Sequence, residues 1–276
     1  MTTDLSAYRR WAETPAAEPI EYSVVIPAYN EAERIVPTVG AIAVHMSSLD
    51  KSWELIVADD GSTDNTVALL EDLDLVNLYV LRAEANGGKG SAVRRGMLAA
   101  RGRVVLFADA DQSTPIEQFG DLLAEINAGK DVAIGSRAAE GATVANKSIA
   151  RKIFSKGLNV LVRVGFGVPF ADTQCGFKMF TRDAAEKLFR HQLVDEFSFD
   201  LEILYLAKKF DLSVAEVPVE WIDAPGSTVD ATKVAIEFVR DMAQIKWFDI
   251  RGRYKQINHS PSDDQPLVAS PTAAKA

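Results

Sequence analysis

Two aspartates separated by one small residue follow directly after an apolar run in this sequence. Val104–Ala108 form the run, and Asp109 and Asp111 flank Ala110 immediately after it. An apolar run of this length predicts a buried strand, so both carboxylates would lie at its carboxyl end. Carboxylate oxygens are hard ligands, and a divalent cation held by only a few of them stays open to phosphate oxygens. The pattern therefore predicts a metal site that suits a nucleotide diphosphate.

Four more polar clusters also follow apolar runs. Each cluster alone is weak evidence, because Asp-Asp-Gly-Ser or Asn-Gly-Gly is common in ordinary turns. The carboxyl ends of parallel strands lie on one edge of a sheet, so all the clusters would converge on one crevice. Their repeated placement favours a shared site over unrelated turns. The four clusters are Pro27–Glu31, Asp59–Ser62, Asn86–Gly90 and Gly135–Arg137.

The elements that must position these clusters alternate between strand and helix patterns. This alternation predicts an α/β fold with a doubly wound, mostly parallel sheet and helices on both faces. The expected strands are 22–28, 53–58, 78–81, 104–108 and 131–134. The expected helices are 31–49, a helix from Asp64, 89–100 and 115–128.

The pattern changes after residue 140. From 144 to 170 the chain carries five cations and no acidic residue, which favours an anionic partner. We expect a helix over 147–164, a turn-rich passage over 169–176, a helix over 200–209, a strand over 214–221 and a long amphipathic helix over 234–248.

Composition excludes several classes of protein. The formal net charge of −9 argues against nucleic-acid binding. One cysteine excludes an internal disulfide, and three scattered histidines give no zinc pattern. No uninterrupted apolar segment approaches the roughly 20 residues of a spanning helix. The polar N-terminus lacks a secretory signal, so a cytoplasmic location is expected.

The order of the motifs resembles the family 2 inverting glycosyltransferases, which have the GT-A fold. The first resemblance rests on Val25–Glu31, Asp59–Asp64 and Asp109–Asp111. Further motifs resemble the polyprenyl-phosphate sugar synthases. The residue sequence of Asp172–Lys178 is more similar to that of dolichyl-phosphate β-glucosyltransferases than to that of the mannosyltransferases. These further motifs are Gly135–Arg137, Arg151–Ser155, Asp172–Lys178 and Phe199–Glu202.

The resemblance implies a nucleotide-sugar site and a metal site. Asp109 and Asp111 would hold Mg²⁺ or Mn²⁺ against the diphosphate. The mannosyltransferases carry a Gln as third metal ligand two residues beyond the second Asp. This chain has Ser113 at that position and Gln112 one position early, so Ser113 is the expected third ligand, with water as the alternative. The nucleotide-sugar would contact Pro27, Tyr29, Glu31, Asp59, Asp60, Lys89, Asp109, Ala110 and Asp111.

The resemblance also implies a lipid-phosphate acceptor, held by Arg137, Arg151 and Ser155. Such a phosphate is largely dianionic at neutral pH, so it needs positioning more than deprotonation and no general base is assigned. Asp111, Arg137 and Arg151 are the expected catalytic residues. The mixture of cations and apolar residues over 147–164 favours a helix on an anionic membrane surface. A solvated basic helix is the alternative. For the C-terminal helix, packing on the domain and contact with the membrane both stay open.

We therefore expect a peripheral membrane enzyme that transfers glucose from UDP-glucose to a polyprenyl or dolichyl phosphate. Its domain would span 21–255, with a nucleotide-binding half (21–137) and an acceptor-facing half (138–255), between disordered ends at 1–20 and 256–276. The alternatives are mannosyl transfer from GDP-mannose, a soluble or glycan acceptor, and a non-catalytic nucleotide-binding module. A sugar-nucleotide pyrophosphorylase is disfavoured, because the loop after the first strand is not rich in glycine and arginine.

Overall fold

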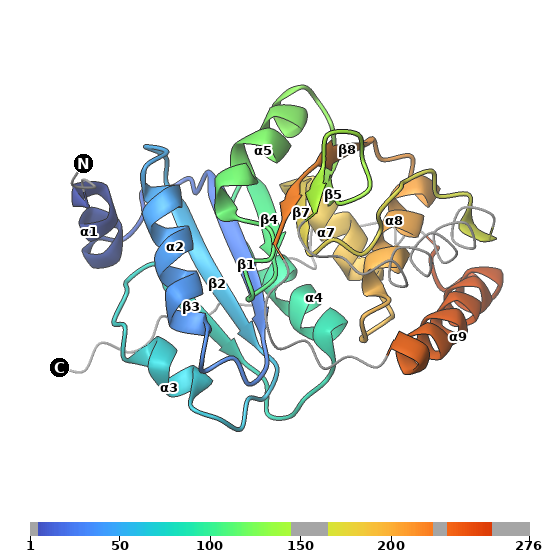
Figure 1. Ribbon diagram of the computed structural model, residues 1–276, viewed down its shortest axis with the longest axis horizontal. Helices are drawn as coiled ribbons and strands as arrows, with labels where there is room; N and C mark the ends of the chain where they lie inside the picture. The colour runs from blue at the N-terminus through green and yellow to red at the C-terminus, as the bar shows by residue number, and fades with distance from the viewer. Residues whose placement is uncertain (1–4, 145–164, 223–230, 256–276) are drawn as a thin grey trace.

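The computed structural model describes residues 5–144, 165–222 and 231–255 (Figure 1). Its main sheet has seven strands in the order β3-β2-β1-β4-β7-β5-β8, and only β7 runs antiparallel to its neighbours. This arrangement confirms the predicted mostly parallel sheet. The strands are β1 (Tyr22–Ala28), β2 (Trp53–Asp59), β3 (Leu78–Arg82), β4 (Val104–Ala108), β5 (Val132–Ser136), β7 (Phe177–Thr181) and β8 (Val214–Pro218).

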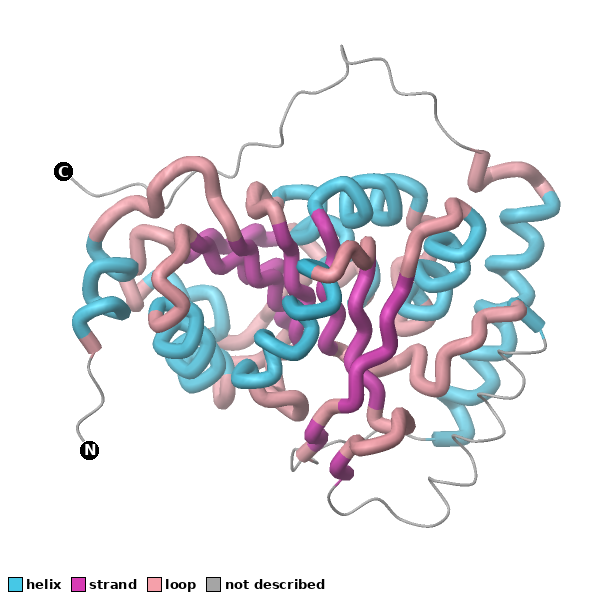
Figure 2. Tube along the Cα trace, turned by 90° about the horizontal axis from the view of Figure 1, so that it is seen from above, coloured by secondary structure: helices cyan, strands magenta, loops and turns pink. Residues whose placement is uncertain are grey.

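The helices cover both faces of the sheet, as Figure 2 shows. Val24 and Ile26 of β1 pack into one apolar core and Val25 into the other, because successive side chains of a strand point to opposite faces. Burial on both faces explains why the central strands are apolar throughout. The first face carries α2 (Ile35–Ser47), α3 (Thr66–Glu71), the 3₁₀ helix η1 (Ile116–Gln118) and α5 (Phe119–Asn127). The second carries α4 (Lys89–Ala99), α7 (Arg182–His191), α8 (Phe199–Lys209) and α9 (Ala231–Ile250).

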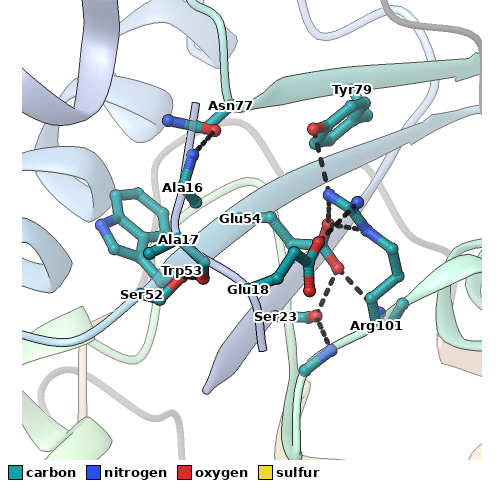
Figure 3. Close-up of polar contacts among 12 residues, drawn as sticks. Ala16, Ala17, Glu18, Ser23, Ser52, Trp53, Glu54, Asn77, Tyr79 and Arg101 are labelled. Atoms are coloured by element: carbon teal, nitrogen blue, oxygen red, sulfur yellow. Dashed lines mark hydrogen bonds and ion pairs between the residues drawn. The ribbon is translucent and has the colours of Figure 1, made fainter. Parts of the chain in front are cut away.

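The N-terminal segment is ordered from residue 5, so the expectation of disorder over 1–20 is wrong for this part. Helix α1 (Ser6–Glu13) buries Trp11, which stacks on Trp53 with ring centroids 4.2 Å apart. The Asn77 side chain accepts a hydrogen bond from the backbone N–H of Ala16 at 2.8 Å (Figure 3). The stacked ring of Trp11 and the buried amide of Asn77 thus attach the N-terminal segment to the domain. The polar composition of this segment does not predict that it buries any side chain.

Strand β7 and helix α7 are absent from the sequence-based expectations. Strand β7 lies between β4 and β5, with Lys178 opposite Phe107 on one side and Ile134 on the other. Lys178 interrupts the apolar pattern of this five-residue strand, so the sequence does not predict it. In the structure the buried Lys178 forms an ion pair with Asp200. Since β7 is antiparallel, its first residue lies beside the carboxyl end of β4, which brings Gly176 to the expected metal site.

A second, two-stranded parallel sheet joins β6 (Thr143–Val144) to β9 (Glu220–Trp221). The single strand expected over 214–221 is therefore two strands, β8 and β9. The basic segment 147–164, with Arg151 and Ser155, and the tail 256–276 lie outside the described residues. Within the described ranges, every helix is too short or too polar to cross a bilayer.

Candidate active site

The loops that follow β1 and β2 form one surface at the carboxyl edge of the sheet. Asn30 adopts a left-handed backbone conformation (φ 55°), and its N–H donates to Ser62 Oγ at 2.9 Å. In return, Asn30 Oδ1 accepts the N–H of Thr63 at 2.9 Å. Pro27 is buried at the end of β1, and Tyr29, two residues later, is 45% exposed. The ring of Tyr29 is thus available to a planar ligand beside these loops.

Asp59 and Asp60 are both buried and shape the surrounding loops. Asp60 Oδ2 accepts the N–H groups of Gly87 at 3.1 Å and Gly88 at 2.8 Å. Asp59 Oδ2 accepts the N–H of Ser62 at 3.1 Å, and Asp59 Oδ1 has no hydrogen-bond partner among the described residues. A buried carboxylate oxygen without a partner is costly, so Asp59 Oδ1 is an acceptor suited to a ligand N–H. The Asp60 carboxylate, in contrast, already accepts two N–H groups of Asn86–Gly90, the glycine loop.

Asp109 is held against Gly176, the residue that precedes β7. Its backbone N–H donates to Gly176 O at 2.9 Å. A Cβ atom on Gly176 would lie 1.9 Å from Asp109 Oδ2, far inside van der Waals contact, so any side chain here would displace the Asp109 carboxylate. Gly176 thereby cradles the carboxylate that the sequence assigns to a metal.

Asp111 and its neighbours form the turn that follows β4. Asp111 Oδ1 accepts the N–H of Ser113 at 2.9 Å, and Ala110 is buried with its carbonyl bonded to Thr38 Oγ1 at 2.6 Å. Gln112 has φ 52° and donates from Nε2 to Thr38 Oγ1 at 3.2 Å, so its amide is bonded to helix α2. The backbone N–H of Ser113 is therefore the group that contacts Asp111.

Asp109 and Asp111 act electrostatically on a third carboxylate, that of Glu31. Burial raises the pKa of Glu31, and the charges of Asp111 and Asp109 raise it further, partly offset by the ion pair with Arg34.

No three His, Cys, Asp or Glu side chains within the described ranges form a metal-binding group. The structure thus offers two carboxylates, a donor set of hard oxygens that fits a divalent cation completed by diphosphate oxygens.

Lys89, the first residue of α4, brings a positive charge to the same place. Its Nζ lies 2.6 Å from Asp109 Oδ1 and 5.6 Å from the centroid of the Phe107 ring. Burial alone would lower the pKa of Lys89, but the carboxylates of Asp109 and Asp200 raise it above its ordinary value. Lys89 is therefore charged and pairs with the carboxylate that the sequence assigns to a metal.

Arg137, the residue after β5, is oriented by Asp172. Its Nε and Nη2 donate to the two carboxylate oxygens of Asp172 at 2.6 and 2.9 Å, and its backbone N–H adds a third bond at 3.0 Å. Burial would raise the pKa of Asp172, but these bonds hold it at about 2. Asp172 is itself fixed by Glu216 of β8, which accepts its N–H at 2.9 Å. Asp109 contributes to the raised pKa of Arg137, so the arginine belongs to the same electrostatic region.

Sequence reasoning left Asp172, Asp200 and Glu202 without a role. Asp172 orients Arg137, and Asp200 forms a buried ion pair with Lys178 at 2.6 Å. A charged residue inside an otherwise apolar stretch is the sequence signal for such a role. The partner does not follow from local sequence, because Lys178 lies 22 positions from Asp200 and Arg137 lies 35 positions from Asp172. Cys175 is buried, and burial raises the pKa of its thiol to about 11, so the thiol is a packing group rather than a thiolate nucleophile.

The chain matches known proteins over most of its length. Residues 23–189 match the family model described as glycosyl transferase family 2. A dolichyl-phosphate beta-glucosyltransferase of Dictyostelium discoideum is 34% identical over 251 residues, which cover 86% of this chain and 77% of that protein. One from Trichomonas vaginalis is 38% identical over 233 residues, which cover 78% of this chain and 69% of that protein. One from Saccharomyces cerevisiae is 34% identical over 260 residues, with coverage of 86% and 78%.

Solved structures share the fold at lower sequence identity. Glucosyl-3-phosphoglycerate synthase from Mycobacterium tuberculosis in complex with phosphoglyceric acid superposes with a TM-score of 0.62 at 18% identity, covering 82% of this chain and 80% of that chain. A complex of the same enzyme with Mn²⁺, UDP-glucose and glycerol 3-phosphate gives a TM-score of 0.60 at 19% identity, with coverage of 87% and 82%. This likeness confirms the predicted GT-A-like fold.

Proposed function

We propose that this chain, which belongs to glycosyltransferase family 2, transfers glucose from UDP-glucose to a polyprenyl or dolichyl phosphate with inversion. One observation carries the proposal above all others: the relatives that match across 78–86% of the chain are dolichyl-phosphate beta-glucosyltransferases. The geometry supports it, because the fixed guanidinium of Arg137 and the Asp109–Asp111 turn could serve two phosphates in one reaction centre.

On the donor side, Asp109 and Asp111 would hold Mg²⁺ or Mn²⁺. Such a cation neutralises the charge that builds on the departing nucleoside diphosphate. Lys89 supplies a second positive charge beside Asp109. Ser113, two residues beyond Asp111, would be the third protein ligand of this cation.

The nucleoside would lie over the loops after β1 and β2. The exposed ring of Tyr29 offers a stacking surface for the base, and Asp59 Oδ1 offers a free acceptor. Pro27, Glu31, Asp60 and Ala110 shape the loops or the turn around this position.

On the acceptor side, Arg137 would bind the lipid phosphate together with Arg151 and Ser155. Asp172 occupies Nε and Nη2 of Arg137, so the guanidinium is held in one orientation. Nη1, which makes no hydrogen bond to the described residues, would bind the phosphate. A dianionic phosphate oxygen is already a nucleophile, and its attack on the anomeric carbon needs only alignment opposite the leaving diphosphate. No protein base is required.

The proposal includes peripheral association with the cytoplasmic face of a membrane. Helix α9 exposes Val239, Trp247 and Ile250, and Ile250 is 83% exposed. The guanidinium of Arg251 lies 5.0 Å from the Trp247 ring centroid. Aromatic and aliphatic side chains beside cations suit the surface of an anionic bilayer.

A panel of donors and acceptors tests the proposed function. Purified protein with Mn²⁺ or Mg²⁺ is incubated with UDP-glucose or GDP-mannose, and with a short polyprenyl phosphate or 3-phosphoglycerate. We expect nucleoside diphosphate release only with UDP-glucose and the lipid phosphate together. Release with GDP-mannose would replace the donor, and release with 3-phosphoglycerate would replace the acceptor class. An absence of release with every pair would overturn the proposal.

A further inference from the structure

Glu202 is a fully buried carboxylate in the first turn of α8. Its Oε1 accepts the N–H of Leu193 at 3.0 Å, and its Oε2 accepts the N–H of Val194 at 2.9 Å. The hydroxyl of Tyr254 donates to Oε1 as a third bond. Three donors thus converge on one buried carboxylate, which lies outside the residues assigned to donor, metal or acceptor.

The turn that Glu202 holds packs directly on the glycine loop before α4. A Cβ atom on Gly88, whose φ is 97°, would lie 2.4 Å from Asp195 O, so the two segments touch through their backbones. The N–H of Ser91 donates to Asp195 O at 3.0 Å. The Gln192 side chain adds a bond to Gly90 O at 2.9 Å. The glycine loop cannot shift without moving the turn at 192–195.

The opposite side of the glycine loop faces the donor site. Asp60 accepts its N–H groups at Gly87 and Gly88, and the next residue, Lys89, reaches Asp109 at 2.6 Å. The place of Lys89 is therefore fixed from two sides, by Asp60 and by the turn bound to Glu202.

The third partner of Glu202 comes from the end of the described chain. Tyr254 is 1% exposed, follows α9, and packs edge-on against Phe248 with ring centroids 6.2 Å apart. Its hydroxyl joins the segment after α9 to the same carboxylate that holds the 192–195 turn. A continuous set of contacts thus runs from the end of α9 to Lys89.

We infer that Glu202 is a positioning residue that couples the segment after α9 to the glycine loop, and through it to the binding of a nucleoside diphosphate beside Lys89. The nature of the ligand rests on the proposed function, whereas the coupling rests on the contacts above. Removing the Tyr254 hydroxyl loosens the Glu202 carboxylate, the turn and then the glycine loop. Loss of order in that loop weakens binding of the diphosphate.

Tyr254→Phe tests the coupling, because it removes one hydroxyl and keeps the ring. Tyr205→Phe is the matched control, since the Tyr205 hydroxyl donates to Asp249 rather than to Glu202. Amide hydrogen exchange is measured over residues 85–92 of the free protein, and calorimetry gives the Kd of UDP and GDP with Mn²⁺. Tyr254→Phe is expected to speed exchange in this peptide and to raise the Kd of the bound diphosphate about fivefold, about 1 kcal/mol of lost binding free energy.

Glu202→Gln is the second variant and is expected to show the same localised change. The coupling is overturned if both variants leave exchange at 85–92 and the Kd unchanged, or if exchange rises evenly across the chain, as for a purely structural role. If GDP binds in place of UDP, the proposed donor is wrong but the coupling is still tested. Hydrogen exchange is measured without turnover, so a failure of the coupling is distinguished from a failure of the proposed function.

Discussion

The carboxylate of Asp172 holds the guanidinium of Arg137 through two hydrogen bonds of 2.6 and 2.9 Å, and the two residues lie 35 positions apart. The loop at 171–172 is in turn anchored on Glu216 of β8. Arg137 is thereby fixed before any ligand arrives, which reduces the ordering that a bound phosphate would otherwise require.

Arg137→Lys is expected to lower kcat/KM about 100-fold, the size typical of losing one preorganised charged donor. A lysine carries the charge but cannot reproduce the planar fork that Asp172 holds. Steady-state kinetics with varied lipid phosphate measures the change. Arg103→Lys, an exposed residue paired with Glu21, serves as the control with wild-type kinetics. Equal kinetics in both variants would contradict the role of Arg137.

Gly176→Ala is expected to weaken Mn²⁺ binding by about 10- to 100-fold, as for loss of a group that supports a metal ligand. The new Cβ would occupy the place of Asp109 Oδ2 and displace that carboxylate. Titration of Mn²⁺ followed by electron paramagnetic resonance measures the affinity. Gly120→Ala in α5 meets no atom within 4 Å and should leave the affinity unchanged. Wild-type affinity in Gly176→Ala would remove Asp109 from the metal site.

The sequence predicts the central strands because they are apolar and covered on both faces. It also predicts the carboxylate pair, because Asp109 and Asp111 directly follow β4. It does not predict the antiparallel β7, because Lys178 interrupts the apolar pattern and its partner Asp200 is 22 residues away. Contacts of this kind depend on the tertiary fold rather than on local sequence.

The orientation of single side chains is equally hard to predict. Gln112 is adjacent to the acidic pair in sequence, yet its left-handed backbone conformation and its bond to Thr38 place the amide on α2. Trp11 lies in a polar segment that suggests disorder, and its stack on Trp53, together with the bonds to Asn77, attaches that segment to the domain. Each outcome depends on contacts between residues that lie far apart in the sequence.

Trp11→Ala is expected to lower the free energy of unfolding by about 3 kcal/mol, the low end for truncating a buried aromatic. The variant loses the stack on Trp53 and the bond from Trp11 Nε1 to Trp53 O at 3.1 Å. Urea denaturation measures the loss, and Arg9→Ala, exposed on the same helix, is the control. Unchanged stability in Trp11→Ala would show that α1 does not contribute to the fold in solution.

Glu202 is expected to make stability depend on pH. Burial raises its pKa from 4.5 to about 7, outweighing the bonds from Tyr254 and the backbone. The folded protein therefore keeps this proton to a higher pH than the unfolded chain, so the stability contributed by this group falls as pH rises from about 4.5 to about 7 and then levels off. Urea denaturation across this range should show the decline in the wild type relative to Glu202→Gln. A constant difference between the two proteins would contradict it.

The most direct test of the proposed glucosyl transfer is identification of the lipid product. The protein is incubated with UDP-glucose, Mn²⁺ and a polyprenyl phosphate, and the lipid fraction is analysed by mass spectrometry and by the anomeric coupling in its NMR spectrum. We predict a β-linked glucosyl polyprenyl phosphate, formed by the wild type and absent with Asp111→Ala. An α-linked product, a product of equal yield from Asp111→Ala, or a lipid fraction without glucose would contradict the account.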